Sequence, residues 1–146
     1  MNTKQLALLV GGVAPAFLFG IAGVMQKVTN RAGIGTGPYL MGLGISIFVV
    51  GALFACWDRD LTLNARSGTF VCLFGVIWAV ATACIAIALK RYDGQIGQLV
   101  AIYNTNTLVA VVLGLVALSE WRNVQPGRLV VAAVMIVAGG VLAARS

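Results

Sequence analysis

Five consecutive residues that can form side-chain hydrogen bonds, Tyr103-Asn104-Thr105-Asn106-Thr107, lie inside an otherwise apolar segment. A helix turns by about 100° per residue, so these side chains point in all directions around the helix axis. Each asparagine amide has two N–H donors that need partners where water is absent. We therefore expect either that this helix is surrounded by protein or that it is locally broken and lines a cavity.

Two interpretations of this polar run stay open. In the structural one, the asparagines hold neighbouring helices together through hydrogen bonds that contribute about 0.6 kcal/mol each. In the functional one, the run is part of a polar substrate-binding site near the membrane interior. A tryptophan inside the third apolar run, with Thr82 one turn away, and a glutamine at the end of the first run are its companions. The predicted binding residues are Tyr103, Asn104, Asn106, Thr107, Trp78 and Gln26.

Other chemistry has few residues to support it. The sequence has no histidine, and its three cysteines, Cys56, Cys72 and Cys84, are widely spaced. Neither a metal site nor a disulfide framework is indicated by that spacing. We therefore expect no enzyme, no catalytic residues, no metal and no cofactor.

The acidic residues indicate the class of solute. All four carboxylates lie in the connections between apolar runs, at Asp58, Asp60, Asp93 and Glu120. A protonatable acid within a span, of the kind that couples proton flow to the export of a cation, is therefore not visible. A neutral polar, zwitterionic or anionic solute suits the Asn, Thr, Tyr and Trp side chains better.

Long apolar segments must position these side chains. A bilayer's hydrocarbon core is about 30 Å thick and takes about 20 helical residues to cross. A composition of 60% hydrophobic and 10% charged residues leaves too little polar surface for a water-soluble globule. We predict an all-α membrane protein, with residues 1–146 forming a single membrane domain. Its five transmembrane helices cover residues 6–25, 38–57, 68–89, 99–118 and 129–144, and the glycine-containing stretch from Gln26 to Gly37 has loop character.

The basic residues bear on orientation. Counted on alternate sides of the membrane, the ten Lys and Arg residues divide five against five: Lys4, Arg59, Arg66, Arg122 and Arg128 on one side, and Lys27, Arg31, Lys90, Arg91 and Arg145 on the other. Orientation normally follows an excess on one side, so the chain has the charge balance of a dual-topology protein. The alternative is that one residue near the first span fixes a single orientation. The basic residues form no stripe with aromatics, and we expect no nucleic-acid partner.

An odd number of spans leaves the two termini on opposite sides of the membrane. Two copies inserted in opposite orientations form an inverted pair, the geometry from which many transporters are built. We therefore expect each chain to be half of an inverted-repeat transporter, working as an antiparallel homodimer or with a second five-helix chain.

Small residues and one proline predict local features of the helices. The pairs Gly139/Ala143 and Gly140/Ala144 have the small-xxx-small spacing that lets helices approach closely, either in a dimer or within one subunit. Pro15 has no amide donor and crowds the carbonyl of Gly11. We expect a kink there, which either serves as a hinge or only shapes the helix.

The C-terminal third resembles a known family. The features that carry the resemblance are an apolar stretch, Leu108–Leu118, leading into Ser119-Glu120, then Gln125-Pro126-Gly127 and a last helix that ends Ala138-Gly139-Gly140-Val141-Leu142. Together they are similar to the end of an EamA-like module of the drug/metabolite transporter superfamily. Ser119 stands where that family usually has glycine, and Thr107 stands where it has a proline that bends the helix.

The resemblance implies a ten-helix solute transporter made by tandem duplication or by pairing of five-helix chains. This chain resembles the short members, which must dimerise. It also implies a multi-pass protein of the bacterial inner membrane that moves a small polar metabolite or drug-like solute by alternating access, in contact with membrane lipid. The rival interpretation is a non-transporting membrane subunit whose polar run binds and stabilises another membrane protein.

Overall fold

The computed structural model describes residues 2–59, 61–117 and 125–145, and every regular element in these ranges is a helix. The predicted all-α class is therefore confirmed for this part of the chain. Ser119-Glu120, Trp121 and Arg122 lie outside the described residues. The elements are α1 (Thr3–Leu8), a π-helical turn η1 (Leu9–Val13), α2 (Ala14–Arg31), α3 (Thr36–Asp58), α4 (Ala65–Arg91), α5 (Ile96–Tyr103), α6 (Asn106–Ala117) and α7 (Pro126–Ala144).

Four helical segments are long and apolar enough to cross a membrane: Gln5–Arg31, Thr36–Asp58, Ala65–Arg91 and Ile96–Ala117. They correspond to the first four predicted spans. The apolar part of α7, Gly127–Ala143, is shorter. The whole of α7 has 19 residues and is about 28 Å long at about 1.5 Å per residue. The fifth span therefore remains a prediction.

The surface of these helices is suited to lipid. Phe17, Phe48 and Phe74, one from each of the first three segments, are 71%, 75% and 68% exposed. Among the described residues no large side chain is fully buried. Such apolar surface is stable only in an apolar medium, because its exposure to water costs about 25 cal/mol per Å². The helices thus have the length, composition and surface of an integral membrane protein.

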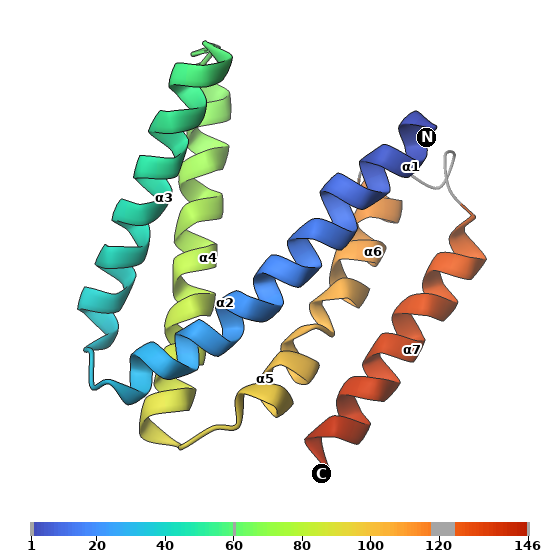
Figure 1. Cartoon of the computed structure of the whole chain (residues 1–146). Coiled ribbons are helices and arrows are strands. Elements are labelled where there is room, and N and C mark those ends of the chain that lie inside the picture. The colour runs from blue at the N-terminus through green and yellow to red at the C-terminus, as the bar shows by residue number, and fades with distance from the viewer. Residues whose placement is uncertain (1, 60, 118–124, 146) are drawn as a thin grey trace. The chain divides into compact units, whose positions relative to one another are not determined.

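The chain forms two compact units, Met1–Asp93 and Gly94–Ser146. In the first unit, α4 packs against both α2 and α3 (Figure 1). One hydrogen bond joins α2 to α4: Gln26 Nε2 donates to Thr82 O. A second joins α4 to the connection between α2 and α3: Lys90 Nζ donates to Ile34 O. Both join residues 56 positions apart. This equal separation shows that α2 and α4 run in the same direction, as alternate spans must.

The connection between α2 and α3 is shorter than the sequence suggested. The loop expected from Gln26 to Gly37 is wrong, because α2 continues to Arg31 and α3 begins at Thr36. Two polar side chains bond back to their own helix: Thr29 Oγ1 donates to Met25 O at 2.8 Å, and Asn30 Nδ2 donates to Gln26 O at 2.8 Å. The helix therefore continues past its apolar run, with these polar side chains satisfied by its own carbonyls.

The irregularity expected near Pro15 is present as a π-helical turn. The N–H of Ala14 donates to Leu9 O, five residues earlier. Pro15 follows directly, and because it has no N–H it cannot continue the regular ladder. Wider turns of this kind are a recognised cause of helix bending. The predicted kink site therefore has a structural counterpart.

In the second unit, α7 packs against both α5 and α6 and runs in the opposite direction (Figure 1). The helices approach closely at Gly140, where a Cβ atom would lie 2.6 Å from Ala101 O and 3.3 Å from Thr105 Cγ2. A Cβ on neighbouring Gly139 would meet nothing within 4 Å. Only glycine at position 140 permits this contact between two backbones.

Candidate functional site

The fourth apolar segment is broken in the middle of the polar run. Helix α5 ends at Tyr103 and α6 begins at Asn106, with Asn104 and Thr105 in a turn between them. Across this turn the backbone bonds link residues three apart: Thr105 N to Ile102 O at 3.0 Å, Thr107 N to Asn104 O at 3.1 Å, and Leu108 N to Thr105 O at 3.0 Å. The expected local break is therefore present, whereas a cavity beside it remains a prediction.

The residue types explain why the break occurs here. Asn and Thr have lower intrinsic helix propensities than the Leu and Ala around them, because their side chains compete for backbone hydrogen bonds. Four such residues in succession, Asn104 to Thr107, weaken the helix locally. In a regular α-helix the Thr105 N–H would reach Ala101 O, but it bonds Ile102 O instead. Ala101 O is the carbonyl that faces Gly140.

The polar side chains differ in exposure around the break. Asn104 and Asn106 are exposed, whereas Tyr103, Thr105 and Thr107 are half-buried. Thr105 faces α7, because its Cγ2 atom lies next to Gly140. The two amides are therefore open to whatever surrounds this helix. The break also lies close to the middle of the 22-residue segment Ile96–Ala117. In a helix that spans a membrane, this position is near the membrane midplane.

The other two predicted residues, Gln26 and Trp78, belong to the first unit and are linked through Thr82. Gln26 Nε2 donates to Thr82 O at 3.4 Å, and Thr82 Oγ1 donates to Trp78 O at 2.8 Å. Gln26 is buried, whereas the Trp78 side chain is 37% exposed. Trp78 lines a cavity of about 200 Å³ between α3 and α4, whose other lining residues are Leu40, Leu43, Gly44, Ile47, Gly75 and Ala79. Its surroundings are thus apolar.

The structure also has a buried polar residue that sequence reasoning missed. Asn30 is 6% exposed, and its Oδ1 atom has no hydrogen-bond donor among the described residues. The amide cannot simply be flipped, because Nδ2 must donate to Gln26 O. Asn30 lies on a buried face of α2 with Gly23, Gln26 and Lys27. Their three- and four-residue spacing was the available signal, but Gln26, Lys27 and Asn30 fall in the stretch for which the sequence predicts loop character.

The predicted site residues thus fall into two groups. Tyr103, Asn104, Asn106 and Thr107 come together at the break between α5 and α6. Gln26 and Trp78 stand on α2 and α4 of the first unit. A single site formed by both groups remains a prediction.

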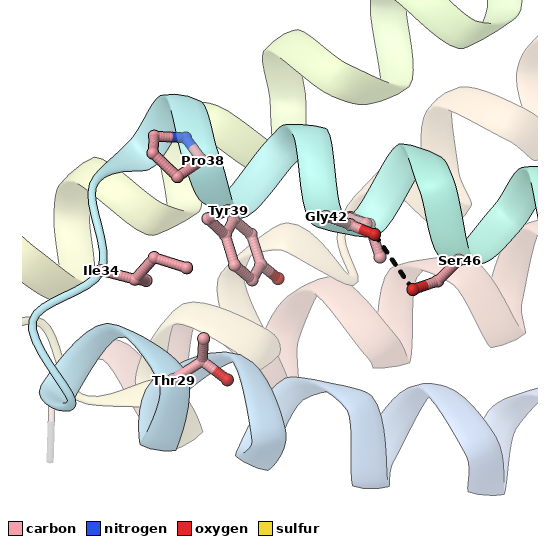
Figure 2. Close-up of a pocket in the computed structure, with 7 residues that line it drawn as sticks. Thr29, Ile34, Pro38, Tyr39, Gly42 and Ser46 are labelled. Atoms are coloured by element: carbon pink, nitrogen blue, oxygen red, sulfur yellow. Dashed lines mark hydrogen bonds between the residues drawn. The ribbon is translucent and has the colours of Figure 1, made fainter.

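A second cavity lies where α2 and α3 meet their connection. It is an open groove of about 300 Å³, lined by Thr29, Ile34, Pro38, Tyr39, Gly42, Leu43 and Ser46. Figure 2 shows the Tyr39 ring between the two helices, on the side of α3 that faces Thr29. None of these residues was predicted as functional.

Metal chemistry finds no support in the described ranges, where no three His, Cys, Asp or Glu residues gather in a way that could hold an ion. Comparisons of the chain with protein-family models, with curated proteins and with solved structures gave no match.

Proposed function

We propose that the chain is one half of a membrane transporter that moves a small polar solute by alternating access. The observation that carries this proposal is the break at Asn104-Thr105, near the middle of an apolar segment long enough to span a membrane. Irregular backbone at membrane depth is stable only where protein buries it or where it lines a water-filled cavity. Broken helices near the midplane commonly form the substrate sites of secondary transporters.

The chemistry of the break favours an uncharged polar, zwitterionic or anionic solute. Asn104 and Asn106 offer both amide donors and carbonyl acceptors, and Tyr103 and Thr107 add hydroxyl groups. These groups form directional hydrogen bonds but carry no charge to neutralise a cation. In this proposal, the solute fills the hydrogen-bonding capacity that the exposed amides leave open.

The second half of the transporter would be another copy in the opposite orientation, or a related five-helix chain. The support is the five-against-five division of basic residues and the extensive apolar surface of the first three helical segments. The resemblance of the C-terminal third to EamA-like modules of the drug/metabolite transporter superfamily favours the same assembly. It also favours the bacterial inner membrane as its location.

Solute binding at the break can be tested by thermal stabilisation in mild detergent across a panel of metabolites. A solute that stabilises the wild-type protein should fail to stabilise the double variant Asn104→Ala plus Asn106→Ala, because each lost hydrogen bond contributes about 0.5 to 1.5 kcal/mol. Thr69→Ala is a suitable control, since the Thr69 hydroxyl only bonds Ala65 O on its own helix. Equal stabilisation of the wild-type protein and the double variant would show that the solute binds elsewhere.

The antiparallel pair makes a separate prediction about topology. With a reporter at the C-terminus, the wild-type chain should be found in both orientations. Adding one arginine at the start of α3, for example Thr36→Arg, should shift most of the chains to one orientation, because the charge tie is then broken. The measurement is the ratio of two reporters that are active on opposite sides of the membrane. A wild-type chain found in one orientation only would exclude the antiparallel homodimer.

A further inference from the structure

The cavity between α2 and α3, here called the interhelix groove, has walls that suit an apolar occupant. Its two aliphatic hydroxyls are already bonded to carbonyls of their own helices: Thr29 Oγ1 to Met25 O at 2.8 Å, and Ser46 Oγ to Gly42 O at 3.0 Å. The second bond is visible in Figure 2. The remaining wall is formed by Ile34, Pro38, Leu43 and the Tyr39 ring. Methylene groups therefore fit these walls better than a polar solute does.

The groove extends along the helix from the α2–α3 connection. Ile34 and Pro38 line it at the connection, and Ser46 lines it eight residues further along α3. At about 1.5 Å per residue, this corresponds to a depth of about 12 Å. Tyr39 stands near the start of α3, where an amphipathic ring belongs at the headgroup level. The groove thus begins at the membrane interface and runs into the hydrocarbon region.

A positive charge lies beside the end of the groove at the α2–α3 connection. Lys90 Nζ donates to Ile34 O at 2.8 Å, which places an exposed ammonium group beside a residue that lines the groove. Arg31 and Arg91 end α2 and α4 in the same unit and are exposed. The connections after α2 and after α4 are expected on the same side of the membrane. The residues at these two connections include four basic ones, Lys27, Arg31, Lys90 and Arg91, and one acidic one, Asp93. A negatively charged headgroup is complementary to this end.

We propose that the interhelix groove binds one anionic phospholipid. An acyl chain lies between α2 and α3, and the phosphate lies beside the Lys90 ammonium group. The groove's aliphatic walls and the neighbouring Lys90 ammonium group match the two parts of an anionic phospholipid, whereas an apolar helix from a second copy would bring no negative charge to that group. Basic pockets at the ends of membrane helices commonly bind lipid phosphates. This proposal is independent of whether the protein transports a solute.

Two glycines on α3 allow a matched test of the groove. Gly42 lines the groove and Gly51 does not, and a Cβ atom at either position would meet nothing within 4 Å. Gly42→Leu places a side chain in the groove, whereas Gly51→Leu makes the same change further along the same helix. The affinity of each full-length variant for phosphatidylglycerol, phosphatidylcholine and inorganic phosphate can be measured by native mass spectrometry in mild detergent.

We expect one phosphatidylglycerol per wild-type chain, bound about fivefold more tightly than phosphatidylcholine, as one nearby lysine should provide. Gly42→Leu should weaken both lipids by roughly tenfold or more, the effect of losing about 1.4 kcal/mol, and Gly51→Leu should bind like the wild type. Lys90→Gln should remove the preference for phosphatidylglycerol and leave phosphatidylcholine unchanged.

Three outcomes would overturn the lipid site. One is equal lipid binding by the Gly42→Leu and Gly51→Leu variants. Another is inorganic phosphate binding as tightly as phosphatidylglycerol, which would indicate an anion site without a groove for the acyl chain. The third is loss of a protein dimer in Gly42→Leu with lipid binding unchanged, which would indicate that a second copy occupies the groove.

Discussion

Replacing Gly140 by valine is expected to disrupt the packing of α7 against α5, with a loss of about 3 kcal/mol or more in the free energy of unfolding. The reason is the position of Ala101 O, which would lie 2.6 Å from the new Cβ atom. A backbone carbonyl cannot rotate away as a side chain can, so the two helices must separate. For a chain of this size, a loss of about 3 kcal/mol lowers the melting temperature by roughly 10 °C.

The neighbouring glycine provides the control. Gly139→Val makes the same chemical change at a position where a Cβ atom meets nothing within 4 Å. Valine and glycine differ by only a few tenths of a kcal/mol in helix propensity, so we expect the melting temperature of this variant to stay within about 2 °C of the wild type. Thermal unfolding of both variants in the same detergent measures the difference. Equal melting temperatures would contradict the close contact between Gly140 and Ala101.

This contact also bears on the two small-xxx-small pairs of α7. The sequence left open whether they serve dimerisation or packing within one subunit. The structure assigns Gly140 to packing within the subunit, because its neighbours are Ala101 and Thr105 of the same chain. Gly139 has no such neighbour and is exposed. Spacing alone could not distinguish the two roles, since the two residues of each pair are four positions apart in both cases.

Apolar runs predicted the existence of the helices but not their ends. Hydropathy changes at Gln26, yet α2 continues to Arg31, and the polar side chains of Thr29 and Asn30 find partners in carbonyls one turn earlier. The burial of Asn30 therefore could not be foreseen from the apolar pattern. A helical reading of positions 23, 26, 27 and 30 would have placed them on one face, which the structure shows to be buried.

The polar run was the most informative signal for the candidate site. Side chains that compete with the backbone, in the middle of an apolar segment, made a local break one of two expected arrangements, and the structure has a break between Tyr103 and Asn106. The surroundings of Trp78 were not predictable in this way. They depend on Leu40, Leu43 and other residues of α3, which are distant in the sequence. Contacts of this kind follow from tertiary packing and have no local pattern.

The second large effect concerns access of water to the break. If the exposed amides line a solute pathway, cysteines at positions 104 and 106 should be in contact with water although they lie near the middle of a membrane-spanning segment. Thiols react with maleimides as thiolates, a form that hydrocarbon surroundings strongly disfavour. We therefore expect Asn104→Cys and Asn106→Cys to be labelled by a membrane-impermeant maleimide at least roughly tenfold faster than a cysteine that faces lipid.

The reference is Val112→Cys on α6, an apolar position that is 48% exposed, lies six residues beyond Asn106 and is expected to face lipid. The three native cysteines, Cys56, Cys72 and Cys84, are exposed and must first be replaced by alanine. Labelling is then measured in sealed membrane vesicles. A second sample, unfolded in detergent, must give complete labelling of all three variants.

The rate of maleimide labelling at positions 104 and 106 in intact membranes is the measurement that tests the proposed transporter most directly. The proposal predicts fast labelling at both positions, slow labelling at position 112, and protection of positions 104 and 106 by any solute that stabilises the wild-type protein. Labelling at positions 104 and 106 that is as slow as at position 112 would contradict it. The asparagines would then be sealed against neighbouring helices, as expected for a non-transporting membrane subunit.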